Sequence, residues 1–266
     1  MDRFREWPYA FPDTHAAVSA VIRARSTNPR DVRDVALAGL DLSACDRVLD
    51  LGCGFGFMGE AVAGRIARGA EVVGVDGCPA NGPAFRARVE ATGRQAGFHL
   101  LDLDRSLPFP DASFALVVSS YSLYFFPAIL PEVARVLASG GLFVALTHHC
   151  DVLQGILLGL GEIEAAARLA DLTGRFCAER GAAVLAPYFP EVESIPYPNT
   201  LRFGREYAGE ALAYLDFKVG ILVPGEAAPA RRARLDRALG TWLDRHGEVV
   251  VPKDDVAFRA RRPPCR

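Results

Sequence analysis

From residue 47 onward, short apolar runs alternate with segments in which apolar residues recur at helical spacing. The apolar runs predict five strands, at residues 47–51, 71–75, 97–101, 113–119 and 142–147. The helical spacing predicts helices between them, at residues 57–68, 83–92 and 129–138. Strands that alternate with helices form parallel sheets covered on both faces. The pattern therefore predicts an α/β fold with a doubly wound, mostly parallel, Rossmann-like sheet.

The segments on either side of this core follow other patterns. At the N-terminus we expect a helix over residues 14–25 capped by Asp13, and a second helix opened by Asn28-Pro29. After Thr147 we expect an Ala-rich helical stretch at residues 151–182 and a segment rich in Pro, Tyr and Phe at residues 186–203. Two helices should follow at residues 207–218 and 228–246, and two closing strands at residues 248–251 and 256–260. We expect one domain with four parts. N-terminal helices or a lid occupy residues 1–45, and a cofactor-binding core occupies residues 46–147. A substrate-side insertion follows at residues 148–246, and closing strands at residues 247–266.

Composition removes several classes of function. The 266 residues carry a formal net charge of −2, whereas nucleic-acid binding needs a strongly basic surface. No run approaches the ~18 apolar residues of a membrane span, and residues 1–6 are charged and lack an apolar signal core. We expect a cytoplasmic protein that binds neither nucleic acid nor membrane. Six cysteines without zinc-like spacing are expected to be reduced, at positions 45, 53, 78, 150, 177 and 265.

A glycine-rich turn follows the first strand, in Asp50-Leu-Gly-Cys-Gly-Phe-Gly56. Glycines let the backbone turn sharply and approach a ligand at the carboxyl ends of parallel strands. We expect Gly52, Cys53, Gly54 and Gly56 to cradle that ligand. The turn also fits a dinucleotide pattern, but Asp50 would repel a pyrophosphate. A carboxylate there suits a cationic ligand such as S-adenosylmethionine.

Acids also follow the second and third strands. Asp76, followed by Gly77, is placed to accept hydrogen bonds from two ribose hydroxyls; the alternative is a helix N-cap. Asp102 is placed to accept from an adenine amino group, with Leu103 against the ring; the alternative is a solvated loop acid.

These motifs together resemble the class I S-adenosylmethionine-dependent methyltransferases, in their small-molecule (type 11-like) branch. The resemblance covers residues 46–147 and rests on the stretches 48–56, 74–76, 107–118 and 132–141. Ala115 departs from it, because the family usually has an acid there. The resemblance implies a seven-stranded sheet whose last strand is antiparallel. It also implies cofactor contacts at Asp50, Gly52, Cys53, Gly54, Asp76, Asp102, Leu103 and Ser119.

Candidates for the acceptor side follow the fourth and fifth strands. Methyl transfer from a sulfonium needs mainly alignment, and a base only if the acceptor is protonated. His148 is the candidate base, ahead of His149, with Tyr121 and Tyr124 near the methyl group. The alternatives are a histidine that bonds a neighbouring loop and tyrosines that only line the pocket. No metal site is expected, because adjacent residues of an extended chain point in opposite directions.

The sequence thus predicts methyl transfer from S-adenosylmethionine to an O, N or C atom of a small molecule. A nicotinamide-dependent oxidoreductase and a cofactor-binding protein without catalysis remain as alternatives. The aromatic, Pro-rich stretch 187–199 is expected to form a lid, together with Phe4, Trp7, Tyr9 and Phe11, or else to pack on helices or in a dimer contact. The chain is expected to be a monomer or a homodimer.

Overall fold

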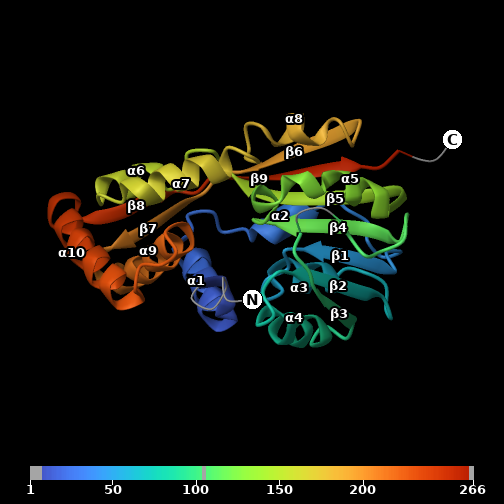
Figure 1. Ribbon diagram of the computed structural model, residues 1–266, viewed down its shortest axis with the longest axis horizontal. Coiled ribbons are helices and arrows are strands. Elements are labelled where there is room, and N and C mark those ends of the chain that lie inside the picture. The colour runs from blue at the N-terminus through green and yellow to red at the C-terminus, as the bar shows by residue number, and fades with distance from the viewer. Residues whose placement is uncertain (1–7, 104–105, 264–266) are drawn as a thin grey trace.

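The computed structural model describes residues 8–103 and 106–263, so Phe4, Trp7 and Cys265 lie outside the described residues. A seven-stranded sheet dominates it, in the order β3-β2-β1-β4-β5-β9-β6 (Figure 1). From one edge to the other these strands are Gln95–Leu100, Glu71–Asp76, Arg47–Leu51, Phe114–Ser120, Leu137–His148, Asp255–Arg261 and Glu191–Tyr197. The predicted α/β architecture is confirmed.

The strand directions follow the resemblance, but one predicted strand lies elsewhere. Strands β1 to β5 are parallel, and β9 runs antiparallel to both β5 and β6. The expected strand at 248–251 does not join this sheet. It forms β8 (Glu248–Pro252), which pairs with β7 (Thr200–Gly204) in a separate two-stranded sheet. Strand β6, from the stretch expected to be a lid, takes the edge position instead.

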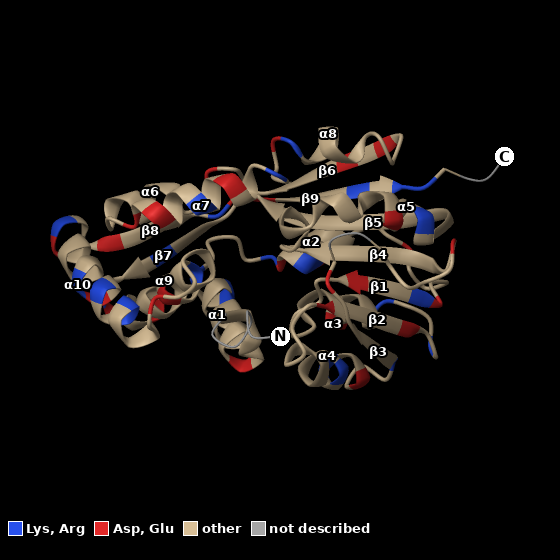
Figure 2. Cartoon of the chain, viewed as in Figure 1, with Lys and Arg blue, Asp and Glu red and all other residues tan. Residues whose placement is uncertain are grey.

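Helices cover both faces of the large sheet. Alternate residues of β1 and β2 show the two faces: Val48 and Val72 pack under α2, α3 and α4, whereas Leu49 and Val73 pack on the side of α5 and α8. These helices span Val32–Leu37, Phe57–Ala63, Asn81–Glu90, Leu130–Val136 and Gly181–Leu185. Short 3-10 turns occupy Pro8–Ala10, Leu123–Phe125, Pro127–Ile129 and Arg205–Tyr207. Basic and acidic residues are interspersed along the elements (Figure 2).

A second hydrophobic core lies beside the sheet, and we call the elements that form it the lateral cluster. It contains the β7–β8 sheet and the helices α1 (Pro12–Arg25), α6 (Gln154–Gly159), α7 (Ile163–Thr173), α9 (Ala208–Leu222) and α10 (Ala228–His246). Figure 1 shows these helices to one side of the large sheet. Helices α6, α7, α9 and α10 and strand β7 of the expected insertion thus join the N-terminal helix in a core of their own, whereas α8 and β6 of the same stretch pack with the large sheet.

The N-terminal helices begin at other residues than predicted. Helix α1 starts at Pro12, which places Asp13 inside its first turn and makes Phe11 the cap, without a side-chain hydrogen bond. Helix α2 is capped by Asp31, whose carboxylate accepts from the Arg33 amide, and not by Asn28. A cap must precede the first helical residue directly, and the chain from Ser26 to Asp31 is extended or bent before α2 begins.

Cys150 and Cys177 form a disulfide, so the expectation of reduced cysteines is wrong for this pair. The two cysteines are 27 positions apart in the sequence. A hydrogen bond of 2.8 Å from the Ala178 amide to the His148 carbonyl holds the segments that carry them together. Of the described residues, Cys45, Cys53 and Cys78 are free thiols. Over the same residues, no helix combines the length and apolar character needed to cross a membrane.

Candidate functional site

A cavity of about 770 Å³ opens at the carboxyl ends of the parallel strands, where α1 and α9 face the sheet. The glycine turn and three acids line one end, which we call the acidic end: Asp50 in β1, Asp76 at the end of β2 and Asp102 just after β3. His148, Lys218, Lys253 and Asp255 line the other end, which we call the lysine end. The cavity therefore presents two regions of opposite charge.

The glycine turn has the backbone that its sequence requires. Gly52 and Gly54 adopt φ values of +65° and +51°, in the left-handed region that favours glycine. A Cβ on Gly52 would lie 2.5 Å from the Cβ of Ser122, so this position has no room for a side chain. The Val75 carbonyl accepts from the Gly52 and Cys53 amides and fixes the turn against β2.

Asp50 is fully buried at the acidic end. Neither of its carboxylate oxygens has a hydrogen-bond partner in good geometry among the described residues. Burial raises the pKa of Asp50 to about 7, even though the nearby Gly59 amide favours the charged form. A buried carboxylate with unsatisfied oxygens is costly, and a ligand with N–H groups or positive charge would relieve that cost.

Asp76 is held by three donors. Its Oδ2 accepts from the Gly54 amide at 2.9 Å, and its Oδ1 accepts from the Cys78 amide and the Asn81 side chain at 2.8 and 3.1 Å. Burial nevertheless raises its pKa above the ordinary value. A carboxylate offers about four lone-pair positions, so most of its capacity orients it across the glycine turn and about one position is left for a ligand.

The lysine end is organised by Asp255. Its Oδ1 lies 2.6 Å from His148 Nδ1, and its Oδ2 accepts from the Tyr121 hydroxyl at 2.7 Å and from Lys253 Nζ at 2.6 Å. Burial alone would raise the pKa of Asp255, but the charge of Lys253 and the contact with His148 outweigh it and lower that pKa to about 2. Asp255 is therefore a buried anion with three partners.

His148 is neutral in this setting. Burial lowers its pKa to about 4, and the charge of Lys253 adds to that effect, while Asp255 opposes it. A neutral imidazole with Nδ1 beside a carboxylate carries its proton on Nδ1. This leaves the Nε2 lone pair without a hydrogen-bond partner among the described residues, on a side chain that lines the cavity. His148 can therefore accept a proton through Nε2.

Tyr121 supports His148. Its ring stacks on the imidazole at 4.5 Å with an interplanar angle of 20°, and its backbone has a φ of +54°, which is rare for a residue with a side chain. Its hydroxyl is committed to Asp255, and burial raises its pKa well above the ordinary value. Tyr121 thus positions the histidine, and its hydroxyl donates a hydrogen bond to Asp255.

The structure brings most of the predicted site residues to the cavity wall: Asp50, Gly52, Cys53, Gly54, Asp76, Gly77, Asp102, Leu103, Tyr121 and His148. Three others do not line it. Gly56 caps α3 in a left-handed conformation, and Tyr124 is buried in the core. The Ser119 hydroxyl forms a hydrogen bond with the Ser122 hydroxyl at 2.7 Å, and the neighbouring Ser120 lines the cavity instead. His149 also lies off the cavity and pairs with Glu179 at 3.0 Å.

The cavity-lining residues that the sequence did not predict include His15, Lys218, Lys253 and Asp255. His15, from α1, stacks on Phe217 of α9 at 5.2 Å and reaches the glycine turn near Gly54. The sequence does single out two of these residues, because Lys218 and Lys253 are the only lysines among the 30 lysine and arginine residues. Both lysines of an otherwise arginine-based chain lie in one cavity.

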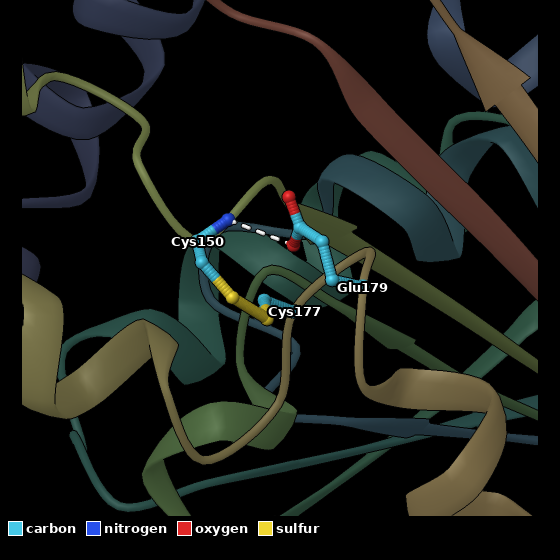
Figure 3. A group of neighbouring side chains, drawn as sticks. All are labelled: Cys150, Cys177 and Glu179. Atoms are coloured by element: carbon cyan, nitrogen blue, oxygen red, sulfur yellow. Dashed lines mark hydrogen bonds between the residues drawn. A yellow bond between two sulfur atoms is a disulfide. The ribbon is translucent and has the colours of Figure 1, made fainter.

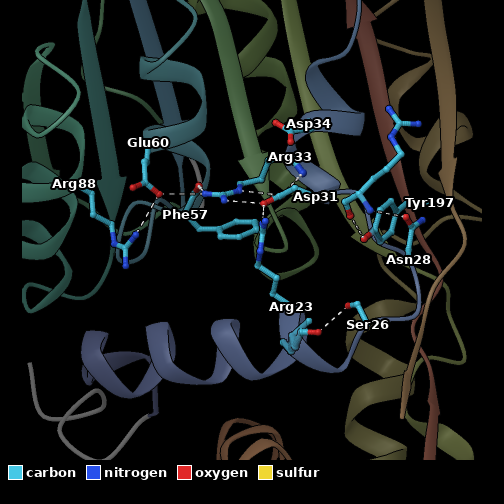
Figure 4. A network of polar contacts seen from close by, with 12 residues as sticks. Arg23, Ser26, Asn28, Asp31, Arg33, Asp34, Phe57, Glu60, Arg88 and Tyr197 are labelled. Atoms are coloured by element: carbon cyan, nitrogen blue, oxygen red, sulfur yellow. Dashed lines mark hydrogen bonds and ion pairs between the residues drawn. The ribbon is translucent and has the colours of Figure 1, made fainter.

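Polar contacts close the rim of the cavity between α1 and the sheet (Figure 4). The Asp31 carboxylate pairs with Arg33 and with Arg23 of α1. Arg33 continues to Glu60 of α3 at 3.2 Å, and Arg88 of α4 pairs with the same carboxylate oxygen. The expected lid stretch contributes only its end, because Tyr197 and Asn199 line the cavity while the rest of β6 pairs with β9. Tyr9 also lines the cavity, whereas Phe11 is half exposed.

Two groups of side chains among the described residues have the spacing of metal ligands. One joins Glu179 to Cys150 and Cys177, whose sulfurs are bonded to each other (Figure 3). The other joins His149, Asp151 and Glu179 near the surface. Both lie outside the cavity wall, so neither group supplies a metal to the site described above.

Comparisons with known proteins agree with this geometry. A family model described as a methyltransferase domain matches residues 48–141. An uncharacterized methyltransferase of Synechocystis sp. is 34% identical over 151 residues, which are 55% of this chain and 68% of that protein. The demethylmenaquinone methyltransferase of Thermus thermophilus is 32% identical over 198 residues, 68% of this chain and 82% of that protein. The crystal structure of the [4+2]-cyclase SpnF superposes with a TM-score of 0.56 over 97% of each chain, and at 16% identity this likeness shows the fold alone.

Proposed function

Because the chain belongs to the class I S-adenosylmethionine-dependent methyltransferases, we propose that it methylates a small molecule held at the lysine end of the cavity, with His148 as the base. The observation that carries this proposal is the His148–Asp255 pair, at 2.6 Å, in the same cavity as the glycine turn and its acids. O, N and C atoms are all nucleophiles that such an arrangement can serve.

The residues of the acidic end fit S-adenosylmethionine. The unsatisfied oxygens of Asp50 suit a ligand that carries an ammonium and a sulfonium. Asp76, fixed by the Gly54 amide, retains an acceptor position for a ribose hydroxyl. Exposed Asp102 and buried Leu103 lie at the wall, where the adenine is expected. The carboxylate of Asp50 beside the glycine turn disfavours a dinucleotide, whose pyrophosphate it would repel.

When bound, S-adenosylmethionine supplies a methyl group on a cationic sulfur that a nucleophile can displace. The protein's own part is to hold the acceptor in line and to remove its proton. The acceptor atom would bond to the methyl carbon as the carbon–sulfur bond breaks, and His148 Nε2 would take up the acceptor's proton. Asp255 then stabilises the imidazolium, because its carboxylate faces Nδ1.

Titration calorimetry tests the cofactor. We expect S-adenosylmethionine to bind and NADH to give no signal. Asp76→Asn should weaken the binding of S-adenosylmethionine by about 1–3 kcal/mol, the range for a lost buried hydrogen-bond partner. Asp236→Asn, at an exposed position of α10, is the matched control and should bind as the wild type does. Preferential binding of NADH would refute the proposed function.

Turnover of methyl-labelled cofactor with a panel of candidate acceptors tests the base. His148→Gln should lower turnover by about 10²–10⁴-fold, the usual contribution of general base catalysis, and leave cofactor affinity unchanged. His149→Gln is the matched control, because this neighbouring histidine lies off the cavity. Equal turnover by the two variants would remove His148 from the reaction.

A further inference from the structure

We propose that the acceptor carries an anionic group, a carboxylate or a phosphate, and that Lys218 binds it. This inference rests on the proposed function, since it names the chemical class of the acceptor in the same cavity. Its basis is the distribution of charged partners around the lysine end.

Most cations at the cavity wall already have a carboxylate partner. Lys253 pairs with Asp255 at 2.6 Å, and Arg23, Arg33 and Arg88 pair with Asp31 or Glu60. Arg30 is exposed to solvent. Lys218 differs from the paired cations because, within residues 8–103 and 106–263, no carboxylate lies within salt-bridge distance of its ammonium, and it differs from Arg30 because it is only partly exposed.

The described groups around Lys218 do not balance the positive charge of its ammonium. The centroid of the Tyr214 ring lies 5.9 Å from the Nζ of Lys218. It is only partly exposed, and it follows Phe217, which packs on His15. Burial lowers the pKa of Lys218 to about 8, and the charge of Lys253 adds to this effect, while Asp255 opposes it. The ammonium is still charged at pH 7.

The charges of the lysine end therefore do not cancel. His148 is neutral, and Asp255 balances Lys253, so Lys218 leaves one positive charge in a partly buried site. An uncompensated buried charge is costly, and a charge partner from the ligand removes that cost. One anionic group on the acceptor neutralises this end, just as the acids of the other end suit a cationic donor.

Lysine-selective NMR tests the proposal, because a protein with two lysines gives two side-chain signals when only lysine is labelled with ¹³C and ¹⁵N. Lys218→Met and Lys253→Met assign the signals. The protein is first saturated with S-adenosylhomocysteine and then titrated with benzoate, phenyl phosphate or neutral benzamide. We expect the Lys218 signal to shift with at least one of the two anions and not with benzamide. Which anion binds more tightly distinguishes a carboxylate from a phosphate acceptor.

The variants supply the second readout. Lys218→Met should weaken binding of the preferred anion at least tenfold and change the affinity for S-adenosylhomocysteine less than twofold. Arg30→Met, the exposed cation at the wall, should change anion binding less than twofold. Equal shifts with anions and benzamide, no shift with either anion, or equal losses in the two variants would each overturn the proposal.

Two outcomes separate this proposal from the proposed function. If S-adenosylhomocysteine alone shifts the Lys218 signal and the anions add nothing, Lys218 binds the carboxylate of the cofactor, and only the inference about the acceptor fails. If S-adenosylhomocysteine does not bind at all, the proposed function itself fails, and the inference fails with it.

Discussion

Asp50 and His148 are both shifted toward their neutral forms by burial. The acid's pKa rises to about 7 and the imidazole's falls to about 4. Both shifts have the sign expected when a charged form loses hydration. Each group therefore gains charge when a partner arrives: Asp50 beside a cation, and His148 on taking up an acceptor's proton.

A proton should leave Asp50 when S-adenosylmethionine binds near pH 7. The acid is then about half protonated, and a positive ligand favours the carboxylate. Calorimetry in buffers of different ionisation enthalpy should report the release of a substantial fraction of one proton. Asp50→Asn should abolish that release. The same buffer dependence in wild type and variant would contradict the assignment.

Wild-type stability should fall between pH 7.5 and pH 5 by about 1–2 kcal/mol more than that of His148→Gln. The pKa of His148 is depressed in the folded state, so the unfolded chain binds more protons between pH 6.5 and pH 4. Stability is therefore lost as the pH falls through this window. Urea unfolding at the two pH values measures the difference, and parallel losses in the two proteins would argue against a buried, neutral His148.

Sequence patterns predicted the residues of the acidic end because each follows a strand within a local motif. The partners of His148 are not local. Asp255 lies 107 residues further along and meets His148 as its register partner between β5 and β9. The predicted last strand began at Val256, one residue too late to include Asp255. Lys218 reaches the cavity from a helix of the lateral cluster, which no strand pattern could place there.

Among the elements, the exchange of β6 for β8 was the main error. Residues 191–197 include Pro196 and several exposed positions, which resemble a loop more than a strand. Proline is tolerated at a sheet edge, and β6 is the edge strand beside β9. Glu248–Pro252 alternates buried and exposed residues as a strand does, but periodicity does not say which sheet a strand joins.

The disulfide should stabilise the junction between β5 and the lateral cluster. Closing a loop of this length contributes about 2–4 kcal/mol. Replacing both Cys150 and Cys177 by alanine should lower the free energy of unfolding by that amount, as measured with urea. Cys45→Ala is the control, since that thiol is free and only partly buried. Quantitative thiol titration that finds both cysteines free in the wild type would contradict the link.

At the scale of the whole molecule, the cavity joins two hydrophobic cores. Helix α1 packs its Val18 into the lateral cluster, and its His15 and Arg23 face the sheet. The division into a cofactor core and a substrate-side insertion stays a prediction, as do the cytoplasmic location and the choice between monomer and homodimer.

Saturation with S-adenosylhomocysteine should slow amide hydrogen exchange in α1 and in the glycine turn. A ligand at 100 times its Kd stabilises the bound form by about 2.7 kcal/mol, or roughly 100-fold in exchange through openings that release it. Helix α8 packs on the face of β6 and β9 opposite to α2. Amide exchange in α8 through local openings should therefore not be slowed. Uniform slowing along the chain would mean that exchange follows global unfolding. Unchanged α1 would mean that this helix takes no part in binding.

The confinement of both lysines to the cavity wall has a practical consequence. Reagents that acylate lysine side chains usually decorate a protein's outer surface, but here the outer basic residues are arginines. A lysine-directed fluorophore or crosslinker would enter the cavity and block it. Coupling of such a reagent would then cost activity, whereas a ligand present during coupling would protect both groups.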